Sequence, residues 1–294
     1  FQCNNCSIEL KQPKVTICHS SSSHSNPYTS IQPNKNGTVD GHISDNGPVW
    51  YPGITVKWGD IIPPFAYIGG TFPGLNWTTE GQNIYNNDCN LPKGTLIVKK
   101  VLTNDNGSTK VFSNFSFNIG ATTYIFDNDG QNDLSVTPGK YTITENTAVG
   151  YTTTYNNCSN ITVPVSGSAT CTITNNDVAP KLTVVKTVKN DNGGTKLVSD
   201  FKLYIDGTAA TSGTAYNVLA NKEITVSEDP LTGYAPSDWG GDCSKDGKIT
   251  LLPGDSKTCT ITNDDIAPSL TLNKVVVNNN GGTAPESAWT LTAN

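Results

Sequence analysis

The stretch KLTVVKTVKNDNGG, residues 181–194, alternates apolar and polar side chains and then runs into an Asn-Asp-Asn-Gly turn. Alternate side chains of a β-strand share one face, so Leu182, Val184, Lys186 and Val188 point to the same side. That face is apolar apart from the lysine. The segment therefore predicts a core-facing strand that carries one buried ammonium group.

The chain repeats this pattern, as TLIVKKVLTNDNGS at 95–108 and as SLTLNKVVVNNNGG at 269–282. The corresponding lysines, Lys100, Lys186 and Lys274, are spaced 86 and 88 residues apart. The first two copies continue through similar strands to CTITNNDVAP and CTITNDDIAP. Repetition at this spacing predicts an all-β protein of tandem antiparallel β-sandwiches, each with about seven short strands.

The predicted domain boundaries follow the repeats, which are joined by the short proline-ended segments VAP and IAP. The third copy supplies two strands at most, which cannot bury a sandwich core. Either a longer chain was cut, or a neighbouring subunit completes the sheet by strand addition. We expect an N-terminal module at 1–93, a first repeat at 94–179, a second repeat at 180–267 and an incomplete third repeat at 268–294.

The overall composition excludes several classes of protein. Charged residues make up 15% of the 294 positions, the net charge is -6, and the basic residues are scattered, so nucleic acid is not an expected partner. No apolar run approaches the roughly 18 to 20 residues needed to cross a bilayer, so no membrane span is expected. Abundant Thr, Asn, Ser and Gly suit short strands joined by polar turns.

Two features predict an extracellular location at the cell surface. The sequence contains no methionine and starts at Phe1, which we interpret as the loss of a secretory leader. It contains eight cysteines, an even number, and two pairs occupy matching places in the two full repeats. Such cysteines indicate disulfides formed in an oxidising compartment.

The alternation test finds two more polar residues among the apolar ones of each full repeat. Glu145 aligns with Ile143 in YTITE, and Asn175 aligns with the apolar positions of CTITN. Glu228 and Asn263 occupy the same places in the second repeat. Burying a lone charge costs several kcal/mol or more, so the Lys, Glu and Asn of each repeat should meet inside it.

Such a trio supports covalent chemistry. A desolvated lysine loses its proton more easily, whereas a desolvated carboxyl group keeps its proton. A neutral amine is a nucleophile, and a protonated Glu can polarise the carbonyl of the Asn side chain. Attack with loss of ammonia would give an amide crosslink.

Residues 94–294 contain the motifs VVKTV, TVSEDPLTGY and TITNDD, with the counterparts LIVKKV, TITENTAVGY and TITNND in the first repeat. With these motifs the segment resembles the B-type repeat domains of bacterial surface adhesins and pilins. The resemblance implies an immunoglobulin-like, prealbumin-like sandwich. It also implies an intramolecular isopeptide bond between the first and last strands, assisted by an acidic residue. The implied bonds are Lys100 to Asn175 with Glu145, and Lys186 to Asn263 with Glu228.

The alternative for each trio is a buried, hydrogen-bonded ion pair without a covalent bond. Lys274 has no partners within the incomplete repeat, so whatever completes that unit must bring a Glu and an Asn. The full repeats add disulfides to the simplest family pattern. The expected pairs, each closing a hairpin late in its repeat, are Cys158 with Cys171 and Cys243 with Cys259.

Residues 1–93 do not copy the repeat and predict a small, β-rich, disulfide-containing module. The strings VTICHSSSSHSNPYTSI, NGTVDGH, DIIPPF and GQNIYNNDC resemble a module of unassigned function at the start of some bacterial secreted surface proteins. Cys18 and Cys89 lie at its two ends, and we pair them. Cys3 and Cys6 then form a local bridge or links to another chain. Heme attachment at this CxxC is excluded because Ser7, not His, follows Cys6.

All three histidines, His19, His24 and His42, lie in the N-terminal module. Imidazoles are common zinc and copper ligands, but here the spacing is irregular and lies in a Ser-rich loop. Turn-capping or solvated histidines are the simpler reading, so we assign no metal and no cofactor. The acidic turn DNDGQND lacks the full spacing of a calcium-binding EF-hand loop.

No nucleophile elbow, P-loop or HExxH motif occurs, so the sequence does not predict an enzyme. We expect a structural subunit of an extracellular fibre, pilus or stalk, whose partners are copies of itself joined head to tail. The alternative is an adhesin whose N-terminal module binds a surface ligand while the repeats form its stalk. Four aromatic residues of the module either form that binding patch or pack in its core: Trp50, Tyr51, Trp58 and Trp77.

Overall fold

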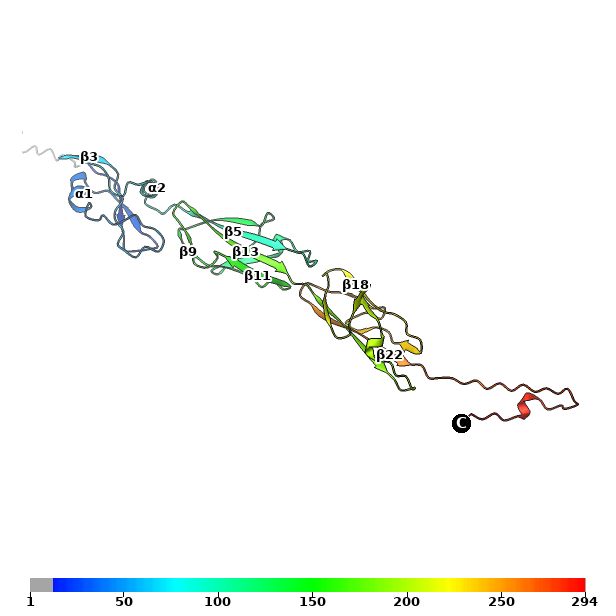
Figure 1. Ribbon diagram of the computed structural model, residues 1–294. Coiled ribbons are helices and arrows are strands. Elements are labelled where there is room, and N and C mark those ends of the chain that lie inside the picture. The colour runs from blue at the N-terminus through cyan, green and yellow to red at the C-terminus, as the bar shows by residue number, and fades with distance from the viewer. Residues whose placement is uncertain (1–12, 294) are drawn as a thin grey trace, which may run out of the picture. The chain divides into compact units, whose positions relative to one another are not determined.

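A computed structural model describes residues 13–293 of the chain, drawn in Figure 1. It divides the chain into two units, one that ends at Val178 and one that begins at Ala179. The first contains the N-terminal module and the first repeat, and the second contains the second repeat and the residues after it. Strands dominate both repeats, and no helix among the described residues is long and apolar enough to span a membrane.

The N-terminal module combines two hairpins with two short helices. Its elements are β1 (Ile17–Ser20), β2 (Tyr28–Ile31), α1 (Lys35–Gly41), β3 (Phe65–Tyr67), β4 (Gly70–Phe72) and α2 (Thr79–Asn86). Strand β1 pairs with β2 and β3 with β4, both antiparallel. The side chains of Asn34 and Thr78 cap the helices by accepting from the N–H groups of Gly37 and Gly81.

The module's core takes up two of the four aromatic residues considered for ligand binding. Trp50 and Trp58 are buried, and the Trp58 indole N–H donates to the carbonyl of Pro27 at 2.9 Å. Trp77 is partly buried against the same core, and Tyr51 alone of the four is exposed. Core packing, not a surface patch, is therefore the role of the two buried tryptophans.

The first repeat is a sandwich of a four-stranded sheet, in the order β11-β13-β5-β8, and a three-stranded sheet, in the order β10-β6-β7, with β9 and β12 paired separately. A 3-10 helix, η1 (Phe112–Asn114), follows the first strand. The strands are β5 (Gly94–Thr103), β6 (Ser116–Ile119), β7 (Thr122–Ile125), β8 (Gln131–Val136), β9 (Gly139–Tyr141), β10 (Ile143–Glu145), β11 (Tyr151–Asn156), β12 (Ile161–Val163) and β13 (Ser168–Asp177).

The second repeat follows the same plan. One sheet has the order β17-β14-β22-β19, with β20 also on β22, and the other has the order β16-β15-β18-β21. The 3-10 helix η2 (Val198–Asp200) takes the place of η1. The strands are β14 (Lys181–Lys189), β15 (Leu203–Ile205), β16 (Thr208–Ala210), β17 (Ala215–Asn217), β18 (Glu223–Glu228), β19 (Tyr234–Pro236), β20 (Gly240–Gly241), β21 (Lys248–Thr250) and β22 (Ser256–Asp265).

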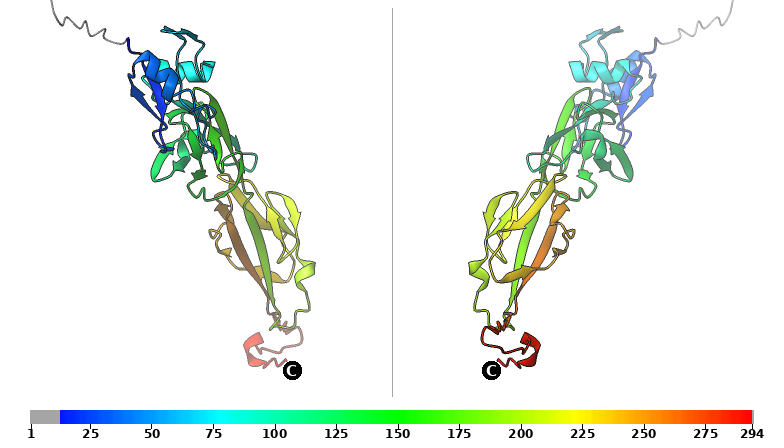
Figure 2. Two further views of the ribbon diagram at one scale, coloured as in Figure 1. Left: turned by 90° about the vertical axis from the view of Figure 1, so that its left-hand side faces the viewer. Right: turned by 90° about the vertical axis from the view of Figure 1, so that its right-hand side faces the viewer.

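The first and last strands of each repeat pair in parallel, unlike the other strand pairs, which are antiparallel. Strand β5 pairs with β13 and β14 with β22, each over nine residue pairs. Figure 2 shows β14 and β22 side by side along the second repeat. The expectation of a wholly antiparallel sandwich therefore needs this correction: the strand that opens each repeat and the strand that closes it run in the same direction.

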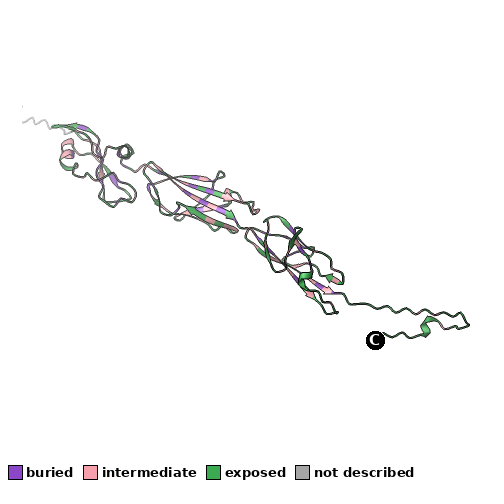
Figure 3. Ribbon diagram, in the orientation of Figure 1, coloured by how far each residue is buried: buried purple, intermediate pink, exposed green. Residues whose placement is uncertain are grey.

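Burial alternates along these strands as the sequence pattern predicts, and Figure 3 shows the colours changing from residue to residue. Leu182 and Val184 are fully buried, and Lys186 on the same face is only 4% exposed. In the first repeat Leu96, Val98 and Ile173 join a core with Phe117 and Phe126. Each repeat thus closes its own hydrophobic core around a buried lysine.

The third copy of the pattern forms no strand within residues 268–293, where we expected up to two. It contains one 3-10 helix, η3 (Glu286–Ala288). Leu270, Val275 and Val277 are each more than 70% exposed, and Figure 3 shows this part of the chain as exposed. A strand needs a neighbouring strand that pairs with its backbone N–H and C=O groups. Residues 268–293 have no such neighbour among the described residues, although they include the sequence of a core strand.

A carboxylate at the end of each repeat holds the turn after its first strand. Asp177 accepts from the backbone N–H groups of Asn106 and Ser108 at 3.1 and 2.9 Å. Asp265 does the same for the turn of the second repeat. Partial burial on its own would raise the pKa of Asp177, but these N–H groups hold that pKa below its ordinary value of 3.8.

This contact predicts an acid-sensitive contribution to the stability of the first repeat. Because the folded-state pKa of Asp177 is lowered, its contribution is full above pH 3.8 and is lost as the pH falls through the folded value. Asp177→Asn should therefore lower the melting temperature at neutral pH, and the difference from wild type should shrink in acid. Calorimetry of the full chain from about pH 7 to about pH 2 measures this.

Asp127→Asn, at an exposed carboxylate of the same repeat, is the matched control and should leave the profile unchanged. An Asp177→Asn effect that stayed constant across this pH range would contradict the assignment.

Candidate functional site: a buried Lys–Glu–Asn trio in each repeat

The parallel pairing brings the lysine of the first strand to the asparagine of the last. Lys100 on β5 is the register partner of Ile173 on β13, and Asn175 is the next residue of β13 on the same face. In the second repeat Lys186 on β14 is opposite Ile261, two residues before Asn263. Both pairs are therefore neighbours on adjacent strands, inside the sandwich.

The glutamate comes from the facing sheet. Glu145 ends β10 and Glu228 ends β18. Antiparallel pairing places them opposite Phe117 on β6 and Leu203 on β15, both of which are buried core residues. Each carboxylate therefore reaches across the core from one sheet toward a lysine on the other.

Lysine and glutamate make direct contact in both repeats. The Lys100 ammonium donates to Glu145 Oε1 in a short contact, and the two side chains are 0% and 1% exposed. Lys186 Nζ lies 2.6 Å from Glu228 Oε2 in an ion pair whose side chains are 0% and 6% exposed. A pair of charges held this deep is not a stabilising surface salt bridge, because desolvation opposes the Coulomb attraction.

Each ammonium group also faces an aromatic ring. Lys100 Nζ lies 4.3 Å from the ring centre of Phe115, and Lys186 Nζ lies 4.3 Å from that of Phe201. These phenylalanines end the matching segments SNF and SDF and directly follow η1 and η2. The ring excludes water from the amine and provides only a weak cation–π attraction in return.

The asparagines are the least satisfied polar groups of the core. Asn175 is fully buried, and neither its Oδ1 nor its Nδ2 has a hydrogen-bond partner among residues 13–293. Asn263 is 1% exposed and donates from Nδ2 to Glu228 Oε1 at 2.6 Å, while its Oδ1 has no partner. A buried amide without partners is rare in proteins and calls for an explanation.

The electrostatics favour a neutral amine. Burial lowers the pKa of Lys100 and of Lys186 below the ordinary value of 10.5, and the neighbouring glutamate only partly offsets this effect. A proton passed from the ammonium to the carboxylate would leave two neutral groups in place of two charges, and burial opposes charges rather than neutral groups. The arrangement can thus supply a nucleophilic amine, a protonated acid and an amide as the electrophile.

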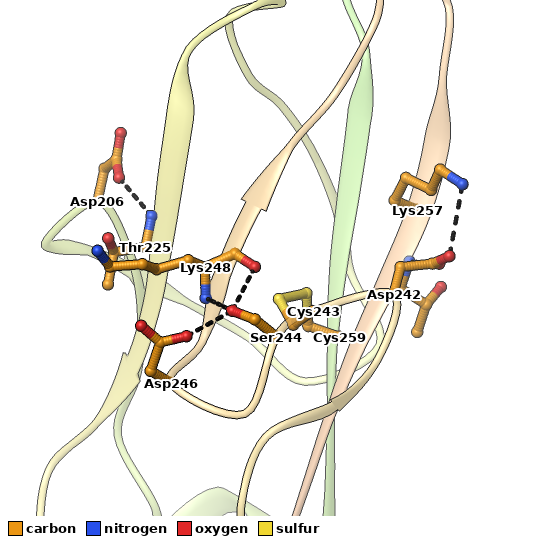
Figure 4. Close-up of a disulfide and its surroundings, with 10 residues drawn as sticks. Asp206, Thr225, Asp242, Cys243, Ser244, Asp246, Lys248, Lys257 and Cys259 are labelled. Carbon is orange, nitrogen blue, oxygen red and sulfur yellow. Dashed lines mark hydrogen bonds and ion pairs between the residues drawn. A yellow bond between two sulfur atoms is a disulfide. The ribbon is translucent and has the colours of Figure 1, made fainter.

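Each full repeat has one disulfide, which ends on its last strand. Cys158 bonds to Cys171 on β13 and Cys243 bonds to Cys259 on β22, across sequence separations of 13 and 16 residues. Figure 4 shows the second bridge, with Ser244 next to it accepting from Lys248 N–H and donating to Asp246. Each bridge ties a loop to the middle of the last strand.

In the N-terminal module Cys18 bonds to Cys89, with their Cα atoms 5.3 Å apart. The predicted partners Cys3 and Cys6 lie outside the described residues. The structure brings His19 and His42 together, with ring centres 5.1 Å apart, and leaves His24 beside Trp58. Lys274 lies over the ring of Trp289, at 4.5 Å, and within residues 13–293 no glutamate forms an ion pair with it as in the full repeats.

Comparison with known protein families agrees with the fold of the repeats. The prealbumin-like fold domain family matches residues 92–175, 177–261 and 265–294. These ranges cover more than half of the chain, which therefore belongs to this family. No protein of established function matches by sequence.

Among solved structures, the TIE protein of Bacillus anthracis is similar at 17% identity and a TM-score of 0.39, over 60% of this chain and 34% of that one. The major pilin of Streptococcus pyogenes is similar at 16% identity and a TM-score of 0.28, over 60% of this chain and 99% of that one. Two B repeat units of the collagen binding protein of Staphylococcus aureus are similar at 14% identity and a TM-score of 0.28, over 87% of this chain and 69% of that one. The chain thus spans about a third of the Bacillus protein's length, and we assign no function from these likenesses.

Breaking the buried pair on one side should destabilise the second repeat more than replacing both partners. Glu228→Ala leaves the Lys186 ammonium uncompensated in the core, and we expect a loss of about 3–5 kcal/mol in the free energy of unfolding. The double variant Lys186→Met/Glu228→Leu removes both charges at similar volume and should recover most of this loss. Denaturant unfolding of the full-length variants measures the difference.

Lys248→Met, at an exposed ion pair with Glu223, is the control and should change stability by less than about 1 kcal/mol. If Glu228→Ala were as stable as the double variant, the pair would not be a buried, coupled one.

Proposed function

We propose that this chain is a structural subunit of an extracellular bacterial fibre, pilus or surface stalk. The observation that carries the proposal is the buried trio of each full repeat, which joins the strand that opens the repeat to the strand that closes it. Family membership and disulfide-stapled repeats support the same role outside the cell. The only chemistry that we assign to the repeats is one self-crosslinking step in each.

In that step the trio forms an isopeptide bond. The proton of the lysine ammonium passes to the glutamate, and the neutral Nζ attacks Cγ of the asparagine while the protonated carboxyl group polarises its Oδ1. A C–N bond to lysine forms, the C–N bond to the amide nitrogen breaks, and ammonia leaves with the transferred protons. The products are Lys100–Asn175 and Lys186–Asn263 amides, with Glu145 and Glu228 regenerated.

Such a bond suits a protein that transmits tension. The chain enters the first repeat through β5 and leaves through β13, and it enters the second through β14 and leaves through β22. A covalent link between these strands carries force directly from one to the other. The sandwich between them then bears none of the load.

The exposed third copy suggests how subunits or repeats continue. Residues 269–277 have the sequence of a core strand, yet four of their apolar side chains are exposed to solvent: Leu270, Leu272, Val275 and Val277. We propose that this segment becomes a strand when the unit is completed, either by further residues of the same chain or by a neighbouring copy. The completing segment would supply the Glu and Asn that Lys274 lacks. Addition between copies would produce head-to-tail filaments.

The adhesin alternative keeps the stalk role of the repeats and adds a ligand for the N-terminal module. Its proposed aromatic patch loses Trp50 and Trp58, which are core residues. The exposed apolar strand sequence of the third copy favours the fibre over the adhesin.

The crosslinks are tested by the intact mass of the protein. Each bond releases one ammonia, so the mass should be about 34 Da below that of the disulfide-bonded chain for two bonds, or about 17 Da per repeat. Lys186→Arg and Asn263→Ala should each restore about 17 Da, because each removes one bond. Lys181→Arg, at an exposed lysine of the same strand, should leave the deficit unchanged.

A mass that showed disulfide losses alone would reject the covalent crosslinks. The buried ion pair would then be the whole site.

Strand complementation predicts self-association through the third copy. A labelled peptide of residues 269–294 should bind the full chain, and Leu270→Asp/Leu272→Asp in the peptide should abolish binding, because both charges would fall on the core-facing side. Fluorescence anisotropy measures binding, and electron microscopy of the full chain shows whether filaments form. No binding at high micromolar concentration, together with isolated particles only, would leave the adhesin stalk as the better function.

A further inference from the structure

The N-terminal module holds a cluster of metal-ligating side chains that plays no part in the crosslinking sites. It consists of His19 on β1, His42 directly after α1, and Asp45 and Asp60 from the following loops. One ligand atom from each residue lies within 4.8 Å of those of the other three. We call these four residues the His–Asp cluster.

Asp60 is the centre of the cluster and is fully buried. Its Oδ2 lies 2.8 Å from Nδ1 of His42, and both of its oxygens lie 3.1 Å from Nδ1 of His19. The N–H of Ser20 donates to Oδ1 at 2.7 Å. Two imidazoles that approach one carboxylate with their rings nearly perpendicular surround a small volume from different directions.

A rigid scaffold holds the cluster in place. Cys18 and Ile61 exchange two backbone hydrogen bonds of 2.9 Å, which fixes His19 and Asp60 beside each other, and the Cys18–Cys89 disulfide anchors the same point. Asn76 donates to the carbonyl of Asp60 at 2.8 Å. Preorganised ligands of this kind lose little freedom when a cation binds.

Two glycines allow Asp45 to approach Asp60. A Cβ on Gly47 would lie 2.2 Å from the carbonyl oxygen of Lys57, and a Cβ on Gly59 would lie 2.3 Å from that of Asp45. Only glycine lets the two backbones come this close. The Asp60 N–H donates to the Asp45 carbonyl at 2.8 Å across this contact.

The outer side of the cluster is open to an entering ion. A pocket lined by His19, Asp45 and Lys57 among others borders it. The carboxylate of Asp45 pairs with Lys57 at 2.7 Å, but the Lys57 side chain is 77% exposed, and an exposed pair of this kind contributes little to stability. Asp45 can therefore exchange Lys57 for a metal ion at little cost.

The geometry points to a structural zinc site formed by His19, His42, Asp45 and Asp60. Zinc prefers four ligands in a tetrahedron at about 2.0–2.2 Å, which puts neighbouring ligand atoms about 3.3 Å apart. The separations of 2.8 and 3.1 Å between the imidazole nitrogens and Asp60 are close to this value. The two neutral imidazoles and two carboxylates also balance the charge of a divalent cation.

The ion would crosslink β1, the end of α1 and the loop before β3. With four protein ligands the site is closed, which is typical of structural rather than catalytic zinc. His24 takes no part, because its ring packs against Trp58 at 4.9 Å.

The test uses the full chain, freed of metal by chelation and then titrated with Zn²⁺ in calorimetry, with elemental analysis of the dialysed product. We expect about one zinc per chain, a raised melting temperature, and a loss of affinity of about 100-fold or more in His42→Gln. His24→Gln is the matched control and should bind as wild type does. Co²⁺ in place of zinc should show the absorption of a tetrahedral site.

The variant Cys3→Ser/Cys6→Ser must also bind zinc normally, which separates the cluster from thiols that lie outside the described residues. Asp45→Asn, on the partly exposed side, serves as a second ligand variant if His42→Gln fails to fold. Absence of zinc uptake by the wild type, or equal binding by His42→Gln and His24→Gln, would overturn the assignment.

Discussion

The fold of each repeat depends on the burial of an ammonium group and a carboxylate beside an amide in an interior that contains almost no other polar groups. None of the three can be solvated, so each must be satisfied by the other two. This requirement also determines strand register. A slip of one residue between β14 and β22 would turn Asn263 outward, and Lys186 and Glu228 would then lie in the core without the asparagine.

The two repeats meet this requirement to different degrees. In the second, Glu228 contacts both Lys186 and Asn263. In the first, Glu145 contacts Lys100 and accepts from the Thr153 hydroxyl group at 3.2 Å, and the Asn175 amide is left without a partner. An amide without a partner among the described residues, next to an amine whose pKa burial lowers, is what the crosslinking step that we propose requires.

The period of two in a β-strand made much of this predictable, because a polar residue at an apolar position of a strand must point inward. That rule alone identified Lys186, Glu228 and Asn263 from the sequence. It could not identify Phe201 over the amine or the parallel pairing of first and last strands, which depend on the packing of distant segments. Asp60 was missed for the same reason: it lies 41 residues from His19, and no local pattern links the two.

The disulfides and the proposed amides connect different parts of the same β-sandwiches. The Cys158–Cys171 bridge joins residues only 13 apart and connects a loop to the last strand, so it does not reach the strand through which the chain enters the repeat. Tension between β5 and β13 would pass through their hydrogen bonds even with that bridge intact. Only a link from Lys100 to Asn175 spans the two ends of the load path. A repeat with a disulfide would therefore still gain from the proposed amide, and the matching sites of both repeats fit the tension-bearing role that we propose for the chain.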